Sequence, residues 1–141
     1  MRGIWVLAAL MMLSALPAKA AEVQARLIRA SNETGKSDPS LADIQGKLKE
    51  KFGYKFYRQL GAHQQPLTPG TKLKMDLGHN FQVFITPQPT EKRQRELELE
   101  WYSSKTLLVR SVVKVVENGH LLVKGPEVGN DWIVLAVSVR N

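Results

Sequence analysis

The chain has 141 residues, enough for one ordinary domain, and its 20 Lys and Arg outnumber its 13 Asp and Glu, for a formal net charge of +7. Cysteine is absent, which excludes disulfides, thiol nucleophiles, cysteine zinc sites and iron–sulfur clusters. Apolar residues make up 43% of the chain and charged residues 23%, so the composition is that of a folded protein rather than a disordered one.

Residues 1–20 have the three-part pattern of a secretory signal peptide. Arg2 supplies the positive start, an apolar run follows from Ile4 to Leu16, and Ala18-Lys19-Ala20 places small residues where a signal peptidase reads them. The run is too short to cross a hydrocarbon core, which needs about 20 residues; an uncleaved anchor is the alternative. We expect Sec-type export, to the periplasm or beyond, no membrane span after cleavage, and one β-rich domain over residues 21–141.

A strand and then a helix are predicted at the start of that domain. Residues 22–30 alternate loosely between apolar and polar side chains, as strands do. After a polar loop, Asp38 is a suitable helix N-cap, Pro39 suits the first turn, and Gly53 is placed to end the helix. The helix carries one apolar stripe, formed by Leu41, Ile44, Leu48 and Phe52.

From Tyr54 onward apolar residues recur at every second position, which is typical of strands. Asn118-Gly119 is a strong hairpin signal and predicts that the strands on either side pair. Strands joined by short turns form antiparallel sheets, whose apolar faces must pack together. The sequence predicts a mainly β fold with one helix (α+β): an antiparallel β-sandwich or open barrel of about seven or eight strands, with the single N-terminal helix covering an edge or an end.

The sequence shows no catalytic motif. His63, His79 and His120 fall in predicted loops or turns, and none has a second histidine at metal-ligand spacing. No serine lies in a nucleophile motif, and no glycine-rich segment has the residues of a phosphate-binding loop. We therefore expect no cofactor, no metal and no enzymatic activity; a hydrolase built from histidine and glutamate that meet only in the folded protein is the remote alternative.

Glu96, Glu98 and Glu100 share one face of a predicted strand. Such a series could supply acid–base or calcium-binding carboxylates, but both roles need ligands of mixed origin around a concave site. We expect instead a solvated sheet face on which these carboxylates pair with cross-strand cations, with Lys72, Lys74 and Arg110 as the candidates.

An aromatic cluster directly after the helix is the best candidate for a partner surface. It consists of Tyr54, Phe56, Tyr57 and Arg58, and alternation predicts that Tyr57 points away from the other three. Tyrosine, tryptophan and arginine are enriched in protein interfaces. Core packing of these side chains is the alternative.

A second candidate surface is basic. It would be formed by Lys72, Lys74, Lys92, Arg93 and Arg95 if the strands that carry them share a face. Such a face would bind small anions or anionic glycans.

Several scattered segments together have a familiar arrangement: residues 23–31 (VQARLIRAS), 38–41 (DPSL), 52–54 (FGY) with Tyr57 and Leu60-Gly61, and 124–126 (KGP). The arrangement resembles small exported bacterial β-rich proteins of unknown function. The resemblance implies a bacterial origin and an envelope location, and it brings no catalytic residue.

The expected function is therefore that of an exported, non-enzymatic protein-binding domain, an accessory or structural component of a bacterial envelope or secretion assembly. Its partner would be another envelope protein, not nucleic acid, and an exposed strand edge could recruit an extended segment of that partner. A periplasmic binder of small ligands or of polyanionic glycans is the alternative from another class. The sequence leaves the oligomeric state open.

Overall fold

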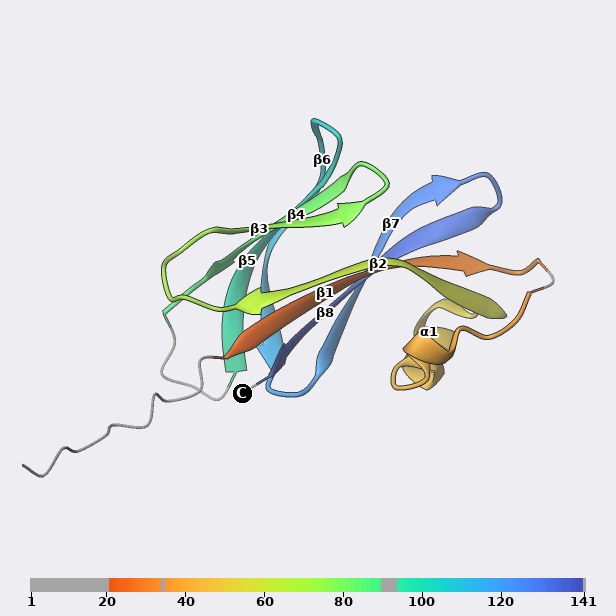
Figure 1. Cartoon of the computed structure of the whole chain (residues 1–141), viewed down its shortest axis with the longest axis horizontal. Coiled ribbons are helices and arrows are strands. Elements are labelled where there is room, and N and C mark those ends of the chain that lie inside the picture. The colour runs from red at the N-terminus through yellow and green to blue at the C-terminus, as the bar shows by residue number, and fades with distance from the viewer. Residues whose placement is uncertain (1–20, 34, 90–93, 141) are drawn as a thin grey trace, which may run out of the picture.

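The structure, a computed structural model, describes residues 21–33, 35–89 and 94–140 (Figure 1). The predicted signal peptide lies outside the described residues. The elements in chain order are β1 (Glu22–Ser31), the 3₁₀ turn η1 (Pro39–Leu41), α1 (Gln45–Phe52), β2 (Phe56–Pro66), β3 (Leu73–Gly78), β4 (Phe81–Pro87), β5 (Gln94–Ser103), β6 (Thr106–Val116), β7 (His120–Val128) and β8 (Asp131–Arg140).

The described strands form two four-stranded antiparallel sheets. Sheet A has the strand order β2-β1-β8-β7 and sheet B the order β3-β4-β5-β6. The first and last strands, β1 and β8, are neighbours at the centre of sheet A, with Glu22 opposite Arg140 and Ala30 opposite Trp132. The predicted mainly β sandwich with one helix is confirmed.

The main core lies between the two sheets. Alternation sends Val23, Ala25 and Leu27 of β1 inward, where they meet apolar residues of sheet B such as Leu99 and Trp101. A Cβ on Gly125 of β7 would lie 2.2 Å from Cη2 of the Trp101 indole, so glycine is what lets this ring rest on the β7 backbone. Burial of these side chains is the principal force that holds the sheets together.

A second core lies on the outer face of sheet A, between the sheet and the helix (Figure 1). The apolar stripe predicted from the sequence supplies the helical side of this core, where Leu41, Ile44 and Leu48 are fully buried. The other side comes from all four strands of the sheet: Ile28, Ala30, Tyr57, Leu122, Val134 and Ala136. Sheet A is therefore apolar on both faces at its centre, which explains why residues 132–137 of β8 are all apolar.

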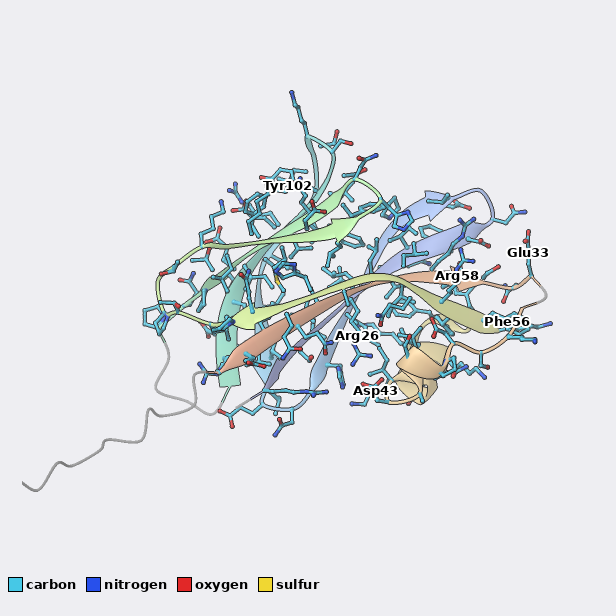
Figure 2. The ribbon with its side chains drawn as sticks, in the orientation of Figure 1. Arg26, Glu33, Asp43, Phe56, Arg58 and Tyr102 are labelled. Atoms are coloured by element: carbon cyan, nitrogen blue, oxygen red, sulfur yellow. The ribbon has the colours of Figure 1, made fainter. Side chains whose placement is uncertain are left out.

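The buried side chain of Arg26 ties the helical segment to the sheet. From β1, its Nη1 and Nη2 donate to the two carboxylate oxygens of Asp43 at 2.9 and 2.6 Å (Figure 2). Such a forked pair fixes geometry as well as charge. It also holds the pKa of Asp43 below its ordinary value.

The helix is shorter than the sequence predicted. Asp38 caps only the 3₁₀ turn, accepting from the Ser40 amide at 3.0 Å, and the α-helix starts at Gln45. The other carboxylate oxygen of Asp38 accepts from the Gln59 amide on β2 at 2.8 Å, so the turn is anchored to sheet A. The predicted end is confirmed, because Gly53 adopts the left-handed conformation and its N–H bonds to the Lys49 carbonyl.

The hairpin predicted at Asn118-Gly119 is wrong in its pairing. The turn is tight, with the Gly119 amide donating to the Val116 carbonyl at 2.8 Å, but β6 and β7 belong to different sheets. The Asn118 amide instead donates to the Val139 carbonyl of β8. The turn therefore carries the chain from sheet B to sheet A, where β7 pairs with β8 instead of β6.

Candidate functional site

A polar pocket of about 410 Å³ opens at one end of the sandwich. Here sheet A continues beyond sheet B. Strand β3 ends beside Gly61 of β2, where an added Cβ would lie 2.0 Å from the Leu77 carbonyl oxygen. The ribbons of β1, β2, β7 and β8 extend past this point (Figure 1). The inner face of sheet A, apolar between the sheets, becomes polar in this overhang. Its lining residues are Arg29, Ser31, Glu33, Gly35, Lys36, Phe56, Tyr57, Arg58 and Asp131.

An ion pair between central strands forms the floor of the pocket. Nε of Arg29 on β1 donates to Oδ2 of Asp131 on β8 at 2.6 Å, and the Asp131 side chain is only 10% exposed. The hydrogen bond from Arg29 lowers the pKa of Asp131, and a bond from Ser31 and the charge of Arg58 lower that pKa further. Asp131 is therefore an ionised carboxylate that Arg29 holds in place.

A second arginine faces this floor. Register places Arg58 of β2 directly opposite Arg29 of β1, and cross-strand partners on one face lie roughly 5 Å apart at their Cβ atoms. Arg58 is exposed and donates no hydrogen bond to any residue that the structure describes. Phe56, two residues earlier, shares its face, and Glu33 lies near both at this end of the molecule (Figure 2). The overhang thus brings two like charges together.

The aromatic cluster predicted as a partner surface is divided by the structure. Phe56 and Arg58 line the pocket, but Tyr57 is 1% exposed and belongs to the second core. Its hydroxyl donates to the Leu48 carbonyl at 2.9 Å and accepts from the Tyr54 amide at 3.1 Å. Tyr54 precedes β2 and packs against the same core, so it is not on the face of Phe56. Only two of the four residues remain candidates for a surface.

The basic face predicted from the sequence is not assembled by its described members. Lys92 and Arg93 lie outside the described residues. Alternation along β5 puts Arg95 on the face of Leu97 and Leu99, the inner side of the sheet, whereas Lys74 on β3 points outward. Lys72 already pairs with a carboxylate. Lys72, Lys74 and Arg95, the three described members, do not share one uncompensated surface.

The predicted cross-strand pairing is present for Glu98 and Glu100 on the outer face of sheet B, whereas Glu96 forms no ion pair with a described residue. Glu100 accepts from Lys72 at 3.3 Å, from Arg110 at 3.1 Å and from the Tyr102 hydroxyl at 3.1 Å. Arg110 is its register partner on β6 and also lies 3.9 Å from Glu98. The hydrogen bond from Arg110, followed by those from Lys72 and Tyr102, lowers the pKa of Glu100. This network organises the sheet surface, with Lys74 outside it.

The histidines stay apart. His63 lies on β2, His79 in the β3–β4 turn and His120 at the start of β7. Within the described residues, no group of three or more histidine and carboxylate side chains is placed to hold a metal ion. Burial, followed by the nearby charges of Lys47 and Arg26, lowers the pKa of His120. The described part of the chain also has no helix of the length and hydrophobicity needed to cross a membrane.

The outer edge of β6 is a second candidate site. β6 spans eleven residues, pairs with β5 along one side, and has no strand partner on its other side among the described residues. Three of its apolar side chains are exposed on the outer face of sheet B: Leu107 by 43%, Val112 by 61% and Val116 by 58%. Sequence reasoning recognised the strand but could not place it at an edge, since strand order depends on pairing between distant segments.

No protein-family model, no curated protein and no solved structure matches this chain.

Proposed function

We propose that the protein is an exported, non-enzymatic binding domain that recruits an extended segment of another envelope protein by adding it as a strand to the free edge of β6. The observation that carries the proposal is the long unpaired edge of β6 with its exposed valines. An edge of this length presents a row of backbone donors and acceptors, which natural proteins usually cover or shorten.

Both faces of β6 would gain from a further strand. Val112 and Val116 are more than half exposed on the outer face, and Val109 and Val113 are only half-buried against the main core. An added strand would place its own alternating side chains beside both rows. Burial of apolar area contributes about 25 cal/mol per Å², in addition to the new backbone hydrogen bonds. The partner segment should therefore be apolar at alternate positions.

Charge distinguishes such a partner from a second copy of the chain. The charged residues of β6 are Arg110 and Lys114, both cations. In an antiparallel pair of two β6 strands, setting Val112 opposite Val112 brings Arg110 opposite Lys114, and setting Val112 opposite Val116 brings two Lys114 together. Like charges directly opposite are destabilising. Arg110 already pairs with Glu98 and Glu100 on β5, so Lys114 is the cation that a partner's carboxylate would meet. We therefore assign the edge to a foreign segment that carries such a carboxylate.

A synthetic peptide tests the edge directly. A nonapeptide that alternates valine with glutamate should slow amide hydrogen exchange along residues 107–115 of the protein, and a valine–lysine peptide should not. Val112→Lys should abolish the protection, whereas the matched control Val128→Lys, at a 40% exposed valine of β7, should retain it. Equal protection by both peptides, or protection outside β6, would refute strand addition at this edge.

The natural partner can be sought by photo-cross-linking in the native host. A benzophenone amino acid at position 112 should give a discrete cross-linked product that the same group at position 128 does not give. The partner's cross-linked peptide should contain alternating apolar and acidic residues. A product of twice the protein's mass at position 112 would instead show self-association, and would overturn the assignment to a foreign segment.

A further inference from the structure

The pocket at the end of sheet A carries an excess of positive charge. Its charged lining consists of the cations Arg29, Lys36 and Arg58 and the carboxylates of Glu33 and Asp131, which leaves one positive charge uncompensated. Asp131 is committed to Arg29 at 2.6 Å, so it neutralises one of the two facing arginines. The other, Arg58, forms no ion pair with a described residue, although its charge acts on the nearby carboxylates of Asp131 and Asp38.

We propose that this pocket binds a small organic monocarboxylate, whose carboxylate lies between Arg29 and Arg58 and whose apolar part rests against Phe56. Arg29 uses its Nε for Asp131, and its two Nη groups donate to no described residue. The Arg58 guanidinium is likewise available. An arginine fork matches a carboxylate in two parallel hydrogen bonds, and two arginines that are cross-strand partners on neighbouring strands can hold both oxygens.

The size and charge of the pocket select the ligand class. A volume of about 410 Å³ fits a small organic molecule and lies within the usual range of about 300–1,000 Å³ for ligand pockets. The net charge of +1 on the lining matches a monoanion. A dianion such as phosphate would bring more negative charge than the lining can balance and would be repelled by Glu33 and Asp131. The Phe56 ring gives apolar contact that inorganic anions cannot use.

This site lies apart from β6 and does not rest on strand addition, because Phe56 and Arg58 are on β2 of sheet A whereas β6 belongs to sheet B. Failure at one site therefore leaves the other intact. The sequence pointed to half of the site, since Phe56 and Arg58 belong to the predicted aromatic cluster, but it did not pair them with Arg29 and Asp131.

The test is a titration of the purified protein with benzoate, followed by backbone amide chemical shifts. We expect saturable shifts at residues 29–33, 56–58 and 131. Benzamide, which has the ring without the charge, and inorganic phosphate, which has charge without the ring, should each bind at least about tenfold more weakly. Binding of either probe as tightly as benzoate would overturn the assignment to a monocarboxylate.

Arg58→Gln should weaken benzoate binding by at least about tenfold, because a charge-assisted hydrogen bond is lost. Arg140→Gln is the matched control: it removes an exposed arginine from sheet A, at the opposite end of β1 and β8. Arg58 is exposed, so the variant should retain the native spectrum, which verifies folding in the same experiment. Unchanged benzoate affinity in Arg58→Gln, or an equal loss in Arg140→Gln, would refute the site.

Discussion

At the scale of single residues, the structure depends on a few buried polar groups that each have a partner. The Tyr57 hydroxyl is an example: it donates a hydrogen bond to the Leu48 carbonyl of α1 and accepts one from the Tyr54 amide in the segment that follows the helix. A buried group of this kind adds little when it is paired and costs far more when its partner is removed. Substitutions at such positions should therefore be more costly than their size implies.

Tyr57→Phe should destabilise the fold by about 1–2 kcal/mol, because the Leu48 carbonyl and the Tyr54 amide both lose their hydroxyl partner. Urea denaturation measures the change. Tyr54→Phe is the control, since no described residue is bonded to that hydroxyl, and it should change stability by less than about 0.5 kcal/mol. Equal effects of the two variants would contradict the role given to the Tyr57 hydroxyl.

His120 should make stability depend on pH in the mildly acidic range. Its pKa is lowered by burial and by the charges of Lys47 and Arg26, so the folded protein favours the neutral ring. The stabilisation is complete above the ordinary pKa of 6.5 and is lost as the pH falls through the lower folded value, because the unfolded chain takes up the proton first.

We therefore expect His120→Gln to lose less unfolding free energy than the parent protein between pH 7 and pH 5, as measured by urea denaturation at each pH. His63→Gln is the control and should follow the parent. If all three proteins lose the same unfolding free energy over this interval, His120 is not the source of the lower stability in acid. The loss would then arise elsewhere, for example at the paired carboxylates of Asp43 and Glu100, whose pKa values are also lowered.

At the scale of elements, most strands could be predicted because period-two alternation survives wherever one face of a sheet is buried. The helix boundary could not, because Asp38 and Pro39 are equally suited to begin a 3₁₀ turn, and the bond from Asp38 to the Gln59 amide that anchors this turn is not local. The predicted pairing across Asn118-Gly119 was wrong for the same reason, because strand pairing depends on contacts that are not local. The turn residues specify a reversal but not the sheet in which the next strand lies.

Gly46→Ala should stabilise the protein by about 0.5–1 kcal/mol. Gly46 lies in α1, is exposed, and has no atom within 4 Å of the position an added Cβ would take. Alanine there restricts the unfolded chain and favours the helix without any clash. Thermal denaturation should show a higher midpoint, and a lower midpoint would mean that the glycine has a role that the structure does not show.

Gly125→Ala, the same substitution in β7, should have the opposite sign. The new methyl group would lie 2.2 and 2.5 Å from two carbons of the buried Trp101 ring and 3.1 Å from the Ile133 carbonyl oxygen. Overpacking of this kind costs about 1–3 kcal/mol, and the rigid indole has no room to move. Denaturation curves of the two alanine variants, measured together, should lie on either side of that of the parent.

At the scale of the whole molecule, the architecture could be predicted and the sites only in part. Phe56 and Arg58 were recognised from the aromatic cluster, but Arg29 and Asp131 are 102 positions apart and meet only because β1 and β8 pair. Tyr57 was recognised in the same cluster, yet its role is in the core. A local pattern can show which side chains share a face, whereas strand order decides which faces form a pocket.

Export of the protein has a direct test. If residues 1–20 are a cleaved signal peptide, the protein recovered from the native host should begin at Ala21, and N-terminal sequencing or intact mass will show it. Replacing Ala20 with a bulky residue such as tyrosine should block processing and leave the longer form. An unprocessed chain in the parent strain would remove the envelope setting while leaving both binding sites open to test.

The central pairing of β1 with β8 has a mechanical consequence. Glu22 and Arg140 lie side by side at one end of these antiparallel strands, with the pocket at the other end. Tension applied between them would load the ladder from its tip, so its hydrogen bonds would rupture one after another instead of sharing the force. Opened in this way, the strands would separate at low load from Glu22 toward Arg29 and Asp131, the pocket being the last part to come apart.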